Sequence, residues 1–284
     1  MDAEAPNAHR SGRVPALESF AARAGRATIV ALCAAVVLLS RSRIASALDF
    51  PPSDFDILSA DHHQLIGHGH YRLDQSAEAM TLYGENHYLD GEYDVEEDKL
   101  APAGADALPA LLSFRHDFFD ASGRPTFSGR LDTATGLGSC GKPNSTGIQE
   151  FDSEQLKISP DSYAGSSVLI PIQNFVRQPN GASILKLHVF NCAPGPKLLA
   201  VDVKPEAKPQ AWPQYPGELI RTDIQPNFGF WTLVIKPFIP KLAAWFDPSQ
   251  NMLLVGAQIE RYYKGAKIIL VRKREAPLAS PGKK

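Results

Sequence analysis

Residues 80–96 read MTLYGENHYLDGEYDVE, and this stretch decides the class of fold. Apolar and polar side chains alternate on both sides of Asp90-Gly91, with the two-residue period that is typical of β-strands. Asp-Gly between two alternating runs indicates a tight hairpin turn, because glycine readily adopts the positive φ angle that such a turn needs. We therefore expect two antiparallel strands that are joined at residues 90–91.

The same hairpin pattern recurs along the chain. Residues 112–119 are followed by a polar turn and by 125–131, residues 183–190 follow Asn180-Gly181, and residues 252–263 and 266–273 flank Lys264-Gly265. Proline and glycine recur at the spacing of strands and turns. The sequence predicts a mainly β protein, an antiparallel curved sheet or open half-barrel built from hairpins, with few short helices. A two-sheet sandwich fits the same pattern.

Two stretches between the hairpins lack the alternation. We expect a helical turn or two around residues 166–170, ending before Pro171, because proline interrupts a helix interior. Residues 132–159 contain four glycines and no sustained period, which is typical of a long loop or several short crossings. The domain prediction is a single β domain at residues 65–274, a flexible N-terminal segment at 48–64 and a disordered tail at 275–284.

Residues 1–47 have the layout of a secretory signal peptide. Arginines precede an apolar run at residues 27–39, and Ala45-Ser46-Ala47 supplies the small residues of a cleavage site. The run is shorter than the roughly 18–20 apolar residues that a membrane-spanning helix needs. We expect a periplasmic or secreted protein of the bacterial cell envelope. The alternative is an uncleaved segment that anchors the chain to the inner membrane from its N-terminus.

The charge balance limits the classes of partner. Residues 1–47 hold six of the 29 basic and three of the 31 acidic residues, so residues 48–284 carry 23 and 28, a net charge of −5. A mildly acidic protein has no broad attraction for nucleic acid or for anionic membranes. We expect neither nucleic-acid binding nor, after cleavage, a stable membrane span.

Only Cys140 and Cys192 follow the predicted cleavage point. An even pair of cysteines in an oxidising compartment predicts one disulfide. Both cysteines lie in turn-rich sequence, which favours a cross-link between loops. The pair lacks the C-x-x-C spacing of a redox-active site.

A histidine cluster near the predicted first strand suggests metal binding. Four histidines fall within nine residues, namely His62, His63, His68 and His70. Neutral imidazoles at this spacing are suitable ligands for Zn²⁺ or Cu²⁺, and Asp61 adds a carboxylate. His68 and His70 share one face of a strand, because alternate side chains point the same way. The competing interpretation is a set of exposed histidines without preorganised geometry.

The acidic run at residues 92–98 suggests a calcium-binding site at first sight. It lacks the spacing of a calcium-binding loop, and its carboxylates alternate with Tyr93 and Val95. We interpret the run as a strand whose carboxylates face water and whose Tyr93 and Val95 face the interior. The sequence also contains no G-x-S-x-G nucleophile elbow and no phosphate-binding glycine loop. No catalytic residue is assigned.

An aromatic-rich series at residues 228–246 is the best candidate for contact with an apolar ligand. Its candidate lining residues are Phe228, Phe230, Trp231, Leu233, Ile235, Trp245 and Phe246. Both faces of the central segment are apolar, so the segment either lies within the core or lines an apolar cavity. Open barrels commonly hold one such ligand.

From about Asp161 onward the order of features resembles an uncharacterised family of exported bacterial β-rich proteins. The shared features are a hydrophobic segment at residues 167–175, a strand pair ending near Phe190, and Trp245-Phe246-Asp247 before a final hairpin at 253–271. The layout of that family is similar to the half-barrels of periplasmic lipoprotein and lipid carriers. The resemblance implies a curved sheet and a lipid-like ligand, and it assigns no catalytic residue.

These observations favour a non-enzymatic cell-envelope protein that binds or carries a lipid, an acyl chain or a hydrophobic segment of an envelope partner, without a cofactor. The alternative is an exported metal-binding protein or hydrolase that uses Zn²⁺ or Cu²⁺ at His62–His70.

Overall fold

One long sheet winds through the computed structural model, which describes residues 50–274 except 62, 77, 103–107, 145–146, 148, 178–182, 193–194, 230–241 and 262–264. The predicted signal peptide and C-terminal tail lie outside the described residues. The strands are β1 (Ser53–Ser59), β2 (Leu65–Gln75), β3 (Met80–Tyr88), β4 (Tyr93–Leu100), β5 (Leu111–Phe119), β6 (Pro125–Asp132), β7 (Leu137–Pro143), β8 (Gln149–Gln155), β9 (Ser162–Tyr163), β10 (Leu185–Asn191), β11 (Lys197–Pro205), β12 (Gln210–Trp212), β13 (Tyr215–Pro226), β14 (Leu242–Asp247), β15 (Leu253–Glu260) and β16 (Lys267–Arg272).

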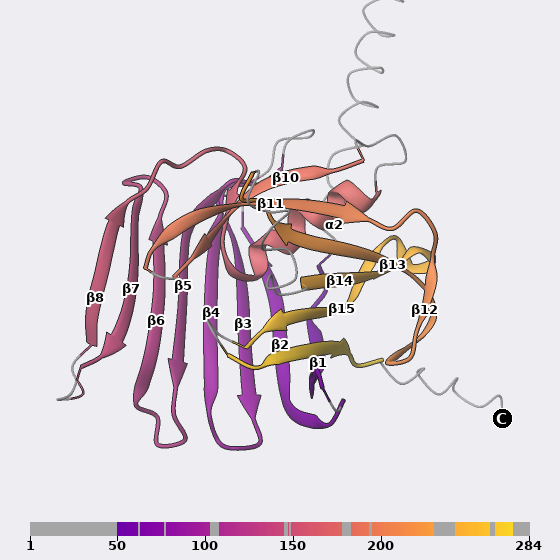
Figure 1. Ribbon diagram of the computed structural model, residues 1–284, viewed down its shortest axis with the longest axis horizontal. Helices are drawn as coiled ribbons and strands as arrows, with labels where there is room; N and C mark the ends of the chain where they lie inside the picture. Colours follow the sequence, from indigo (N-terminus) through magenta and orange to yellow (C-terminus); the bar gives the residue numbers. More distant parts are fainter. Residues whose placement is uncertain are drawn as a thin grey trace, which may run out of the picture. The chain divides into compact units, whose positions relative to one another are not determined.

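The strand order in the sheet is β8-β7-β6-β5-β4-β3-β2-β1-β16-β15-β14-β13-β11-β10-β9, with β12 added beside β13. Among the described strands, each pairing is antiparallel apart from the short parallel contact of β9 with β10. The sheet does not close on itself by hydrogen bonds, so it is an open barrel-like structure. Figure 1 shows the strands from β2 to β8 as one run, with β10, β11, β13, β14 and β15 crossing beside it. The predicted mainly β fold is confirmed.

The predicted hairpins are present. β3 and β4 meet at Asp90-Gly91, and Gly91 has a φ of 88°, a conformation that glycine adopts without strain. β5 pairs with β6, and β15 pairs with β16. Turn chemistry and alternation are local properties, which explains why the sequence indicates these pairs.

The segment at residues 48–64 that we expected to be flexible contains a strand. Residues 53–59 form β1, which pairs with β2 on one side and with β16 on the other. Phe55 and Ile57 alternate with polar residues and are buried, with 2% and 0% of their surface exposed. The apolar pattern was too short to distinguish from a loop, and only pairing with the C-terminal strand reveals its central place.

The expectation of a long loop or several short crossings at residues 132–159 is also corrected, because β7 and β8 form another hairpin there. Almost every side chain of β8 is exposed, since β8 lies at the end of the sheet. A strand that buries neither face has no reason to alternate apolar and polar residues, so its sequence resembles that of a loop.

The helical segment continues beyond Pro171. A 3₁₀ turn, η1 (Gly165–Val168), leads into α2 (Leu169–Arg177), and Pro171 lies in the first turn of α2. Proline is tolerated there because backbone N–H groups of the first turn have no partner within the helix. Ile170 and Ile172 are buried in the core. Figure 1 shows α2 beside the crossing strands. No helix among the described residues has the length and hydropathy needed to cross a membrane.

Buried side chains gather on both faces of the sheet. The largest cluster joins α2, through Ile172, to residues of β1, β2, β10, β11 and β13–β16. A second cluster joins β4–β7 to Ile170 and to Phe190 of β10. A smaller third cluster lies on the opposite face of β14–β16, where Trp212 of β12 stacks on Trp245 with ring centroids 4.3 Å apart.

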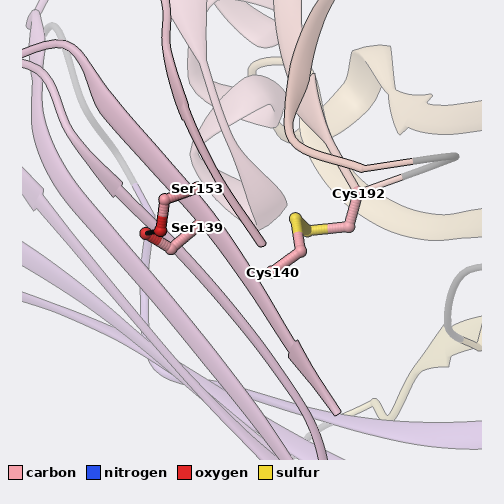
Figure 2. The surroundings of a disulfide bond; sticks show 4 residues. All are labelled: Ser139, Cys140, Ser153 and Cys192. Carbon is pink, nitrogen blue, oxygen red and sulfur yellow. Dashed lines mark hydrogen bonds between the residues drawn. A yellow bond between two sulfur atoms is a disulfide. The ribbon is translucent and has the colours of Figure 1, made fainter. Parts of the chain in front are cut away.

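A disulfide links the two ends of the sheet. Cys140 lies on β7 and Cys192 directly follows β10, each next to the last strand at its own end of the order. Their Cα atoms are 5.7 Å apart. Figure 2 shows the disulfide between Cys140 and Cys192. It also shows Ser139 beside Ser153 of β8, and their Oγ atoms are 3.0 Å apart. The predicted pairing is confirmed, and it joins parts of the sheet that no hydrogen-bond ladder joins.

Loss of this disulfide is expected to destabilise the protein. Replacing Cys140 and Cys192 by Ser releases a cross-link between residues 52 apart in sequence, which in the chain-entropy description lowers the free energy of unfolding by about 4 kcal/mol. Urea unfolding followed by circular dichroism measures the change. Reductant should destabilise the wild-type protein and leave the double variant unaffected; equal stability of both proteins without reductant contradicts the prediction.

Candidate functional site

A cavity of about 310 Å³ opens on the inner face of the sheet. It is bounded by residues from both ends of the strand order and by η1 with the start of α2. Much of its lining is apolar, including Phe55, Phe114, Phe118, Phe190, Ile224 and Leu270. The cavity exists because the sheet curves, so that strands distant in sequence face one another around it.

A polar patch interrupts this apolar lining along β4. Asp94 and Glu96 line the cavity and are almost completely buried, with 1% and 5% of their surface exposed. Asp98 continues the same face and is wholly buried, whereas Val95 is exposed. The interpretation of this run as a solvated acidic face is therefore wrong. The alternation is as predicted, but the carboxylates face inward.

His116 of β5 lies between the two carboxylates. Its Nε2 is 2.8 Å from Asp94 Oδ1, and its Nδ1 is 3.3 Å from Glu96 Oε2. His116 and Glu96 are directly opposite each other in the β4–β5 register. The imidazole ring also lies 4.2 Å from the ring of Phe118 between centroids. The ring is thus held by two charges and packed against an aromatic side chain.

Further donors complete the shell around Asp94. Asn86 Nδ2 donates to Oδ1 at 2.9 Å, and the hydroxyl of Tyr88 donates to Oδ2 at 3.0 Å. Asn86 is directly opposite Asp94 in the β3–β4 register, and its amide also donates to the hydroxyl of Tyr71 at 3.0 Å. Burial and neighbouring carboxylate charge raise the pKa of both tyrosines, so they remain neutral donors.

The 3₁₀ turn η1 contacts the other acidic residues of β4. The backbone N–H of Ser166 donates to Glu96 Oε1 at 2.5 Å, and that of Ser167 donates to Asp98 Oδ2 at 2.8 Å. Gly165 has a φ of 49°, and a Cβ at this position would lie 2.6 Å from Glu96 Oε1. Only glycine therefore allows η1 to approach β4 this closely.

Two groups in this patch favour their protonated forms. Burial alone lowers the pKa of His116, but the charges of Glu96 and Asp94 and the hydrogen bond with Asp94 outweigh it and raise the pKa above its ordinary value. Burial, followed by the charge of Glu96, raises the pKa of Asp98 well above its usual range. Asp98 Oδ1 has no hydrogen-bond partner.

The three candidate residues of the aromatic series that the structure describes do not line this cavity. Trp245 belongs to the cluster on the opposite face, and Phe246 is buried in the largest cluster without lining the cavity. Phe228 is 40% exposed and does not line the cavity. Phe230, Trp231, Leu233 and Ile235 lie outside the described residues. The neighbouring Leu242 and Ala243 do line the cavity.

The histidine cluster is spread over the surface. His68 and His70 share the exposed face of β2, as predicted, but their Nδ1 atoms bind Asp56 and Asp54 of β1 at 2.9 and 2.7 Å. His63 contacts Gln214, and His62 lies outside the described residues. Among the described residues, no group of three histidine, cysteine or acidic side chains is arranged to hold a metal ion.

Comparison with known proteins yields a likeness to solved structures. No protein-family profile and no curated protein matches the sequence. The chain is similar to a solved structure described as a "Beta-barrel-like Protein of Domain of Unknown Function DUF1849 from Brucella abortus", with a TM-score of 0.43 and 10% sequence identity over 80% of this chain and 98% of that chain. That description says nothing of export or lipid carriage.

Replacing Asp98 by Asn should reduce the pH dependence of stability. In the wild type the raised pKa of Asp98 keeps a proton in the folded state that the unfolded chain loses near pH 4, so the free energy of unfolding falls as pH rises above that value. Asn is uncharged at every pH, so the variant should lose less stability than wild type between pH 5 and pH 8. The decline above pH 6.5 that arises from the raised pKa of His116 should remain.

Urea unfolding at a series of pH values measures both curves. Glu97→Gln is the matched control, because Glu97 precedes Asp98 in β4, faces outward and pairs with Lys99. A variant as pH-dependent as the wild type, or a control with the same effect, would show that Asp98 does not hold the proton.

Proposed function

We propose that this chain is an exported, non-enzymatic protein of the cell envelope that holds a hydrophobic ligand in the cavity of its curved sheet. The ligand is a lipid, an acyl chain or a hydrophobic segment of a partner. The observation that carries the proposal is the cavity itself, of about 310 Å³ and largely apolar. Small-molecule pockets usually measure about 300–1,000 Å³ and combine apolar walls with a few polar groups.

Burial of apolar surface supplies the affinity. An alkyl chain with about ten methylene groups gains about 8 kcal/mol when it leaves water, before the loss of its motional freedom is counted. Phe55, Phe114 and Phe190 supply rigid surface for such contacts. The affinity does not require a cofactor.

The contacts of His116 support binding rather than general-base catalysis. A general base needs one ring nitrogen within reach of the proton that it removes. Both nitrogens of His116 already face carboxylates, at 2.8 and 3.3 Å. The polar patch is thus arranged to position a ligand.

Export is supported by two independent features. Residues 1–47 have the pattern of a signal peptide, and the Cys140–Cys192 disulfide is compatible with an oxidising compartment.

Protein purified from the periplasm should carry an apolar molecule. Native mass spectrometry should find a co-purifying species of lipid or acyl-chain mass, released on unfolding in organic solvent. Stoichiometric zinc or copper that disappears on replacing His68 and His70 by Ala, with no lipid present, contradicts the proposal and favours the metal-binding alternative.

Filling the cavity should weaken binding of a neutral apolar probe. Val189 of β10 lines the cavity, so Val189→Phe occupies part of its volume. We expect the affinity for N-phenyl-1-naphthylamine to fall about tenfold or more, equivalent to about 1.4 kcal/mol. Fluorescence titration measures it. The same substitution at exposed Val95 on the outer face of β4 is the control; equal effects of the two variants would contradict binding in this cavity.

A further inference from the structure

The ionisable side chains around the cavity are unequal in sign. Among the described residues, three carboxylates line it, from Asp94, Glu96 and Glu260, against one imidazole, His116, and one guanidinium, Arg261. Burial raises the pKa of Glu260, and Lys267 opposes that shift. The walls therefore contain more acidic than basic groups.

Arg261 does not offset this excess, because acidic residues outside the cavity bind it. Its guanidinium lies 3.2 Å from Asp90 and 2.5 Å from Glu92, and it stacks 3.6 Å above the ring of Tyr88. Two carboxylates thus surround one cation at this edge of the cavity. The local charge there is also negative.

His116 alone balances the carboxylates of the inner patch. When protonated, it neutralises one of the two charges of Asp94 and Glu96. Behind them lies Asp98, completely buried, with Oδ1 lacking a hydrogen-bond partner. The nearby hydroxyl and amide donors of Tyr88 and Asn86 are already used by Asp94. Each oxygen of Asp94 and Glu96 thus has a partner within the protein, and the imbalance of this patch is one of charge.

We infer that the ligand's polar group is a cation, a protonated primary amine, that binds beside Asp94, Glu96 and His116 with its alkyl part against the phenylalanines. This inference rests on the proposed function. An opposite charge within a few ångströms stabilises a cation, and the same carboxylates repel an anion. An ammonium group also brings three N–H donors, and a carboxylate oxygen can accept more than one hydrogen bond.

A preference for an anionic ligand also has a structural basis, so an experiment can decide between the two preferences. A second hollow shares Tyr88, Phe118, Phe127 and Arg261 with the cavity and is also lined by Lys142. A ligand with an anionic group would bind there through Lys142 and Arg261, with its tail in the cavity.

Competition with matched twelve-carbon ligands distinguishes these possibilities. The protein purified from the periplasm is loaded with N-phenyl-1-naphthylamine at pH 7.5, and dodecylamine, 1-dodecanol and dodecanoate are titrated below their micelle concentrations. We expect dodecylamine to bind at least about tenfold more tightly than dodecanoate, with dodecanol between them. The inference is overturned if dodecanoate binds the wild-type protein as tightly as dodecylamine, or more tightly. This outcome does not depend on any variant.

Two isosteric variants locate the charge. Glu96→Gln keeps an oxygen for the Ser166 N–H but removes one buried charge, so the amine-to-carboxylate affinity ratio should fall severalfold. Glu97→Gln makes the same change in net charge on the outer face and should leave the ratio unchanged. Equal ratios in both variants would overturn the assignment to this patch.

Dodecanol separates the inference from the proposed function. If dodecanol displaces the probe but the amine has no advantage, the cavity binds apolar ligands and the inference fails. If none of the three compounds displaces the probe, the proposed function fails and the inference fails with it.

Discussion

A sheet of this length must bury an apolar face along its whole course, and it does so by bending until its two ends approach each other. The apolar side chains of β1–β7 then meet those of β10–β16 and of α2. No hydrogen-bond ladder joins the ends, so packing and the Cys140–Cys192 disulfide hold them together. Both the core and the cavity depend on this approach of the two ends, since the ends of the sheet supply walls that face each other.

The inner face also carries charges that the fold does not need. Removing carboxylates from water is unfavourable, and apolar residues of similar size frequently stabilise a protein as well or better. Here Asp94 and Glu96 are satisfied by an imidazole, a phenol, an amide and a backbone N–H from three separate elements, β5, β3 and η1. Such a network in a cavity is typical of a site that positions a ligand, and it is the basis of the proposed preference for a cation.

The β3–β4 hairpin contributes Asn86 and Asp94 to this site. Asn86 is opposite Asp94 because the loop of this hairpin includes Leu89 as well as Asp90 and Gly91. A two-residue turn at Asp90-Gly91 would have placed Asn86 opposite Val95, so the structure decided this pair. The polar residue Asn86 between the apolar Leu82 and Tyr88 of β3 was the signal that an inner-facing position was polar. The alternation of β4 did not show which of its faces is buried. Tyr93 and Val95 are suitable for a buried face, and the carboxylates are equally suitable for a solvent-exposed face. His116 and Gly165 lie too far away in sequence for any local pattern to connect them.

The sequence by itself determined the class of fold, the hairpins β3–β4, β5–β6 and β15–β16, and the pairing of the two cysteines. These depend on local alternation, on turn residues and on there being only one possible pair after the predicted cleavage point. The central place of β1, the edge hairpin β7–β8 and the inward direction of Asp94, Glu96 and Asp98 were decided only by the tertiary structure. A strand's two faces look alike until the sheet curves, and curvature depends on contacts between residues that lie more than a hundred positions apart.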